Sequence, residues 1–96
     1  MKPQLFPLRN FSGTITAGGT AQNVYTPATA PKVNGVLFQN VSDTDMTIDF
    51  DQDAVAGTGI LVAAGLAYQT PEGFVFSGKL SVLCATTGKA FVCKIW

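Results

Sequence analysis

The sequence predicts an all-β fold, a β-sandwich or jelly roll of about eight antiparallel strands that follows an extended N-terminal arm. Turn signals rich in Gly, Pro, Asp and Thr recur about every 8–12 residues along the chain. Residues 46–51 alternate apolar and polar side chains, which is the period of a half-buried strand. A helix over residues 55–68 is disfavoured because it would contain three glycines, each costing about 1 kcal/mol.

Residues 1–10 are predicted to form the arm. Pro3 and Pro7 disfavour a helix at their own positions and at the residue before each. Burying the four large apolar side chains of residues 5–11 would contribute about 1.5–3 kcal/mol each. Ordering the backbone of the arm costs about 1–2 kcal/mol per residue, so the arm gains little from packing on its own small domain.

We therefore expect the arm to dock on a neighbouring subunit or partner protein, as an added strand or a clamp. The alternative is that the arm packs as an edge strand of its own domain. The expected contact residues are Leu5, Phe6, Leu8, Arg9 and Phe11.

Residues 11–96 are expected to form a single domain of alternating strands and turns. Paired glycines at 18–19 and the polar residues 42–45 supply turn residues that adopt positive φ or bond to their own backbone. We expect the last two strands to form a hairpin centred on residues 87 and 88. The expected strands span residues 11–16, 20–26, 33–41, 46–51, 59–63, 66–70, 74–76, 80–85 and 90–96.

The expected last hairpin also predicts the state of the cysteines. It places Cys84 and Cys93 on one face but diagonally, with sulfurs about 7–8 Å apart, which is too far for an unstrained disulfide. We therefore expect two buried free thiols. Alternation along the final strand separates Trp96 from the face that carries Cys93. Trp96 is then either a plug that closes the core or an anchor at an interface.

The composition excludes several classes of function. Six Lys or Arg balance six Asp or Glu, so the chain lacks the concentrated positive field of a nucleic-acid-binding protein. No run approaches the roughly 20 apolar residues of a membrane-spanning helix. Prolines and Arg9 interrupt the segment where a secretion signal would lie, so we expect synthesis in a cytoplasm. Without histidine, a Cys-His dyad, a Ser-His-Asp triad and a His-containing zinc site are excluded.

The acidic residues are concentrated, with five of the six within residues 43–53. Asp49, Asp51 and Asp53 have the spacing that begins an EF-hand loop, but Ala54 and Ile60 replace the Gly and Glu that this loop requires. Glycosidase chemistry is not expected because the carboxylates would line one exposed edge. The remaining interpretations are a solvated strand face, a looser calcium site, and a face where these three aspartates contact a basic partner. We expect no catalytic residue, no cofactor and no resident metal.

Three segments of the sequence resemble small virion proteins of tailed bacteriophages. They are GVLFQNVSDTDMTIDF at residues 35–50, GILVAAGLAY at 59–68 and GKLSVLCATTGKAF at 78–91. The resemblance covers residues 14–92 and leaves the arm outside. It implies a capsid-associated structural protein of the decoration or cement type. Such a protein caps the shell as a homo-oligomer, with a trimer favoured, and binds the major capsid protein or other virion proteins.

The resemblance brings no catalytic residues, and it does not decide between the capsid, the neck and the tail of the virion. A neck or tail accessory protein therefore remains an alternative. A glycan- or receptor-binding module is a further alternative, because it would need an exposed aromatic side chain with polar neighbours. The candidates for that side chain are Tyr25, Tyr68 and Trp96.

Overall fold

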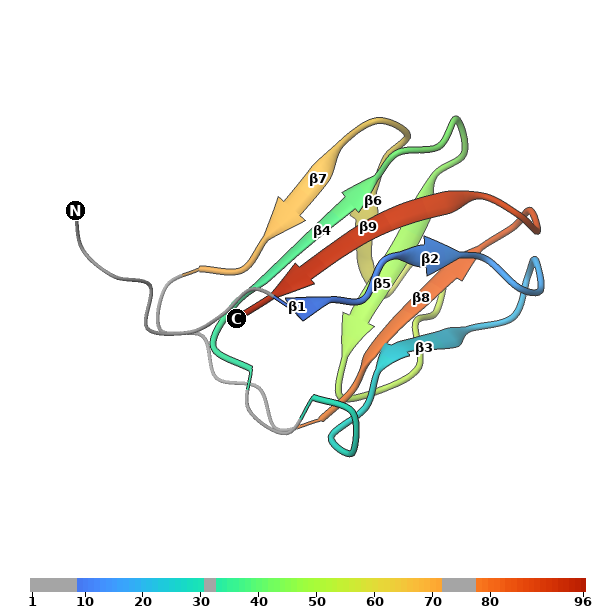
Figure 1. Ribbon diagram of the computed structural model, residues 1–96. Coiled ribbons are helices and arrows are strands. Elements are labelled where there is room, and N and C mark those ends of the chain that lie inside the picture. Colours follow the sequence, from blue (N-terminus) through green and yellow to red (C-terminus); the bar gives the residue numbers. More distant parts are fainter. Residues whose placement is uncertain (1–8, 31–32, 72–77) are drawn as a thin grey trace.

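The computed structural model describes residues 9–30, 33–71 and 78–96, which form two antiparallel β-sheets packed face to face (Figure 1). The described residues contain no helix, and so none that could cross a membrane. The all-β sandwich predicted from the turn spacing and the strand periodicity is confirmed.

The first sheet, sheet A, has β9 (Ala90–Ile95) and β4 (Val36–Asn40) at its centre. Two short strands, β1 (Arg9–Asn10) and β2 (Gly13–Thr14), pair one after the other with the same edge of β9. On the far side, β7 (Ala67–Gln69) pairs with β4 and forms the other end of the sheet.

The second sheet, sheet B, has β8 (Leu80–Cys84) and β5 (Met46–Phe50) at its centre. Its end strands are β3 (Gln22–Tyr25), which pairs with β8, and β6 (Ile60–Val62), which pairs with β5. The end strands of the two sheets therefore lie in pairs, with β1 and β2 beside β3 on one side of the sandwich and β7 beside β6 on the other (Figure 1).

The connectivity is that of a jelly roll. Every connection passes from one sheet to the other, except those from β1 to β2 and from β5 to β6. With β1 and β2 taken as one interrupted strand, each sheet has four strands, and this exchange between two such sheets is the jelly-roll arrangement.

The core lies between the sheets and is made by the inward positions of alternating strands. In β9 the alternation is complete, since Phe91, Cys93 and Ile95 are buried while the residues between them are partly exposed, as predicted. Phe91 stacks on Phe38 of β4 at a centroid distance of 5.3 Å. The described buried hydrophobic cluster consists of Ile15, Tyr25, Ala30, Val36, Phe38, Met46, Ile48, Val62, Leu80, Val82, Cys84, Phe91, Cys93 and Ile95.

The predicted last hairpin is wrong. β8 and β9 are consecutive in the chain, but they belong to different sheets and do not pair. Their connection crosses the end of the sandwich instead, where the Gly88 N–H donates to the Ile15 carbonyl and the Ile15 N–H donates to the Lys89 carbonyl. Cys84 and Cys93 are both buried and free, but they lie in opposite sheets rather than diagonally across one hairpin.

Candidate interaction surface

The side of the sandwich formed by β6 and β7 exposes large apolar side chains. Leu61 in β6 is 63% exposed, Leu66 just before β7 is 60% exposed, and Val41 just after β4 is 49% exposed. Val41 and Leu66 come from neighbouring positions, because Asn40 donates its N–H to the Leu66 carbonyl and Gly65 donates its N–H to the Asn40 carbonyl. Leu61 precedes Val62, whose carbonyl accepts a hydrogen bond from the Asn40 side chain. We call Val41, Leu61, Leu66 and the end strands β6 and β7 the apolar edge.

The apolar edge lacks charged side chains in the part of the chain that the structure describes. No charged residue occurs between residues 54 and 71, a segment that includes both end strands and the turn between them. Natural sheets commonly protect such edges with lysines, inward-pointing charges, bulges or a covering loop. Single exposed apolar residues are ordinary, but several on one uncharged edge are typical of a surface that is covered by another protein segment.

The outer edge of β7 is not paired with any strand among residues 9–30, 33–71 and 78–96. The Leu66 carbonyl accepts the Asn40 N–H, and the Thr70 N–H donates to the Val36 carbonyl, so these two residues turn toward β4. Because backbone groups alternate in direction along a strand, Ala67 and Gln69 turn theirs away from β4. Both residues are exposed, and no strand among the described residues pairs with this edge.

The corner beside the apolar edge is held rigidly by Asn40, which is fully buried. Its amide Nδ2 donates to the carbonyls of Thr44 and Val62 at 2.8 and 2.9 Å. Its Oδ1 accepts hydrogen bonds from the N–H and the hydroxyl of Ser42 at 3.0 and 2.7 Å. The side chain therefore ties β4 to the end of β6 and to the following turn, which gives the apolar edge a fixed shape.

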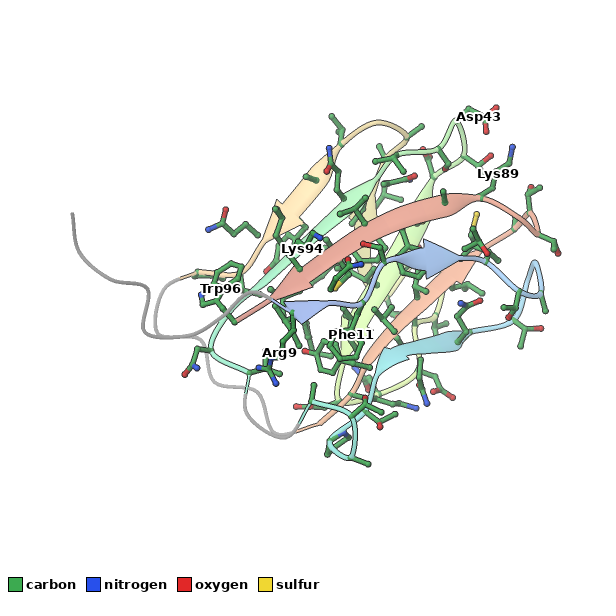
Figure 2. All side chains as sticks on the ribbon, viewed as in Figure 1. Arg9, Phe11, Asp43, Lys89, Lys94 and Trp96 are labelled. Carbon is green, nitrogen blue, oxygen red and sulfur yellow. The ribbon has the colours of Figure 1, made fainter. Side chains whose placement is uncertain are left out.

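The structure describes two of the five predicted arm contacts. Arg9 lies in β1, so the last two residues of the predicted arm belong to sheet A. Phe11 packs against the core and meets the ring of Tyr25 edge-on at 5.8 Å, so it supports its own domain (Figure 2). Leu5, Phe6 and Leu8 lie outside the described residues, and their predicted contacts remain predictions.

The five aspartates do not form one patch, contrary to the expectation of a single acidic edge. Two precede β5, one lies in it and two follow it, which separates Asp45 from Asp51 by roughly 20 Å along the strand direction. Several have local partners: Asp53 pairs with Lys79, Asp45 accepts the Ala64 N–H, and Asp49 accepts the Phe50 N–H. No group of three or more potential metal ligands occurs among the described residues.

In the turn that precedes β5, Asp43 forms a salt bridge with Lys89, with 2.8 Å between the charged atoms (Figure 2). The hydrogen bond from Lys89 lowers the pKa of Asp43 below its ordinary value, and the hydroxyl of Thr44 adds to the shift. Both carboxylate and lysine lie near the tip of the sandwich, far from Arg9 and Phe11 (Figure 2). Asp43 thus lies on a different part of the surface from the three aspartates predicted to contact a partner, Asp49, Asp51 and Asp53.

Two of the three aromatic candidates for glycan binding are engaged within the chain. Tyr25 is only 2% exposed, so it offers no stacking face to a sugar. Tyr68 is half-buried and contacts Phe50 of the opposite sheet at 6.4 Å. Trp96 is also partly buried, and its indole lies so close over Gly35 that an added Cβ would clash with the ring. Of the two roles predicted for Trp96, this packing agrees better with a side chain that closes the core than with an anchor at an interface.

A shallow depression of about 380 Å³ lies on the outer face of sheet B. Thr47, Leu83 and Cys84 line its floor, and Asp45 and Ala56 lie at its margin. The loop after β5 lies over this face at Ser81, since the buried Ala54 donates its N–H to the Ser81 hydroxyl at 2.9 Å. The depression has a single carboxylate and no aromatic wall, so it has little in common with a catalytic cleft or a sugar-binding site.

Comparison with known proteins gives no relative for this chain: no family model, no curated protein and no solved structure matches it. The resemblance to phage virion proteins therefore remains a prediction. The candidate surface rests on the geometry of the chain itself.

The sequence alone does not predict the apolar edge. A signal for it was present, because Leu66 directly follows a turn glycine and the run from 59 to 68 contains no charged side chain. That run was interpreted as two ordinary strands, and strand periodicity alone does not show which strands end a sheet.

Proposed function

We propose that this chain is a structural protein of a bacteriophage virion, a decoration or cement protein that stabilises the capsid shell through contacts between subunits. The apolar edge carries the proposal, because its exposed leucines and uncharged strand edges fit a surface that is covered in an assembly. The resemblance of residues 14–92 to phage virion proteins supports the same role. Jelly rolls occur in viral capsid proteins, although the fold also serves lectins and cupins.

The physical mechanism is additive. Leu61, Leu66 and Val41 each retain about half of their surface for burial, which corresponds to roughly 1 kcal/mol per side chain when a partner covers them. One copy therefore gains only a few kcal/mol from this surface. Many copies on one shell add these contributions together, and the shell then resists rupture by heat or internal pressure. The expected partners are the major capsid protein and further copies of this chain.

Particle composition tests the proposal. Mass spectrometry of virions that contain this chain is expected to give hundreds of copies per particle, as a shell component requires. Particles from which the chain has been deleted are expected to release their DNA at a lower temperature. A dozen or fewer copies would place the chain in the neck or tail, and its absence from all particles would overturn the proposal.

A pair of substitutions tests the surface. Leu61→Asp is expected to reduce occupancy on the shell about tenfold, because a carboxylate cannot be buried without a partner. Val55→Asp is the comparison, since Val55 is 54% exposed but lies in the loop between β5 and β6 rather than in an end strand. Equal effects of the two substitutions would remove the apolar edge from the mechanism.

A further inference from the structure

We propose that Asn34 is a modification site, an asparagine that converts to aspartate and isoaspartate when the packing of Trp96 on the next residue opens. Asn34 is followed by Gly35, which is the sequence in which asparagine loses its amide nitrogen most readily. The other asparagines are each followed by Phe or Val: Asn10, Asn23 and Asn40. This site is independent of the proposed virion role.

The reaction needs only the Asn34–Gly35 step and water. The backbone nitrogen of Gly35 attacks Cγ of the Asn34 side chain and forms a C–N bond, and the side-chain nitrogen leaves as ammonia with the proton from Gly35. Water then opens the cyclic imide at one of its carbonyls. The product is aspartate, or isoaspartate if the chain now runs through the side chain. Glycine favours the attack because it has no Cβ to hinder its nitrogen and a wide choice of backbone angles.

The backbone of this step is held in hydrogen bonds to Trp96. Asn34 is exposed, but Gly35 is buried and donates its N–H to the Trp96 carbonyl at 3.0 Å. The Asn34 N–H donates to the same carbonyl, and the Trp96 N–H donates to the Gly35 carbonyl at 3.1 Å. Imide formation moves the Gly35 nitrogen toward the Asn34 side chain and removes its proton. These hydrogen bonds must therefore break before the reaction can begin.

The Trp96 side chain restrains the same backbone sterically. Trp96 follows β9 (Figure 2), and its indole lies over Gly35 so closely that a Cβ at residue 35 would overlap the ring. The packing therefore requires glycine at residue 35, and glycine after asparagine makes the step reactive. The indole also limits the movement of Gly35 toward Cγ of Asn34. One side chain thus requires the reactive sequence and keeps it closed.

Opening of this corner is expected to set the rate of conversion. Proteins open locally with free energies that range from near zero to the full stability of the fold. Only the open fraction of the chain can react, and isoaspartate inserts a carbon atom into the backbone between residues 34 and 35. The N–H groups of both residues then no longer reach the Trp96 carbonyl together. Conversion to isoaspartate therefore keeps the corner open.

Peptide mapping by mass spectrometry, with separation of aspartyl and isoaspartyl forms, tests whether the site is closed. The full chain is incubated at mildly alkaline pH, folded in buffer or unfolded in guanidinium chloride. Because folding holds the step in hydrogen bonds, we expect conversion of Asn34 to be at least about tenfold slower in the folded chain. Asn10 and Asn23 are internal controls and are expected to stay intact. Equal rates in both states, or an Asn34 that stays intact when unfolded, would overturn the inference.

Two substitutions separate opening of the corner from a general loss of stability. Trp96→Ala removes the indole from Gly35, whereas Phe11→Ala removes a ring that packs on Tyr25. In folded chains, Trp96→Ala is expected to raise the rate at Asn34 about tenfold and Phe11→Ala less than about twofold. Trp96→Phe replaces it if Trp96→Ala does not fold, with an increase of about threefold expected. An unchanged rate in the Trp96 variants, or an equal increase in Phe11→Ala, would overturn the inference.

The single tryptophan of the chain provides a second measurement. The isoaspartyl form, isolated by chromatography, is expected to show Trp96 emission at longer wavelength because the indole becomes more exposed to water. Asn34→Asp is the control, since it adds the charge but keeps the length of the backbone, and its emission is expected to stay unchanged. Emission of the isoaspartyl form that matches the unmodified chain would show that Trp96 does not depend on this step.

Discussion

The two long sides of the sandwich are built differently. On the side of β1, β2 and β3 the chain covers itself: Ile15 is buried between the sheets, and Phe11 packs edge-on against Tyr25. Gln22 in β3 reinforces this side, because its side chain donates to the Thr14 carbonyl and accepts the Thr16 N–H. On the side of β6 and β7, Leu61 and Leu66 are left exposed.

The contrast separates two uses of apolar side chains. Those of the β1–β3 side stabilise the isolated chain, because they are buried on folding. Those of the β6–β7 side contribute little to folding and become stabilising only when another segment covers them. Substitutions on the two sides should therefore act on different equilibria, unfolding on one side and association on the other.

The largest effect is expected at Asn40, which gives the exposed side its shape. Asn40→Ala removes the donors for the Thr44 and Val62 carbonyls and the acceptor for Ser42. Because each buried polar group without a partner costs about 1–3 kcal/mol, we expect a loss of about 3 kcal/mol in the free energy of unfolding, measured by urea denaturation. Ser42→Ala is the control, with a loss of about 1 kcal/mol. A loss below that for Asn40→Ala would show that the corner does not depend on this amide.

The direct comparison of the two sides pairs Phe11→Ala with Leu66→Ala. Phe11→Ala removes a ring that packs on the core and on Tyr25, and we expect it to lower the free energy of unfolding by about 2–3 kcal/mol. Leu66→Ala is expected to change it by less than about 0.5 kcal/mol at dilutions where the chain is monomeric. Urea denaturation of both variants measures the difference. Similar losses would mean that Leu66 is also part of the monomer's core.

The smallest effect, taken per pH unit, concerns alkaline pH and belongs to the core that both sides share. Burial raises the pKa of the Cys93 thiol to about 12. Burial also raises the pKa of Tyr25, and the negative charges of Cys93 and Asp51 add to that shift. The unfolded chain therefore releases these protons at lower pH than the folded chain does. Stability is expected to fall as pH rises above about 9, by at most about 1.4 kcal/mol per pH unit for each group.

Cys93→Ala tests this assignment, because it removes the titrating thiol without adding volume to the core. Urea denaturation between pH 8 and pH 11 should show a shallower decline in stability for the variant than for the unmodified chain. An identical slope for both proteins would mean that Cys93 does not ionise more readily on unfolding.

Several features could be predicted from the sequence because they depend on local chemistry. The alternation of residues 46–51 and of residues 90–96 depends only on the period of two along a strand, and both strands are where it places them. The turn at residues 42–45 follows from side chains that bond to nearby backbone, as the Ser42 hydroxyl does with the N–H and the carbonyl of Thr44. The class of the fold follows from these signals because strands and turns are specified by short segments.

The pairing of the strands was decided only by the tertiary structure. β8 and β9 have the sequence of a hairpin, yet each packs in a different sheet, because the inward faces of both are buried only when the chain crosses the end of the sandwich. Asp43–Asp53 form a cluster in the sequence, but the length of β5 separates them in space. The same long-range pairing leaves β6 and β7 as the ends of their sheets. Whether Leu61 and Leu66 belong to the core or to an interface depends on that placement, which no local pattern contains.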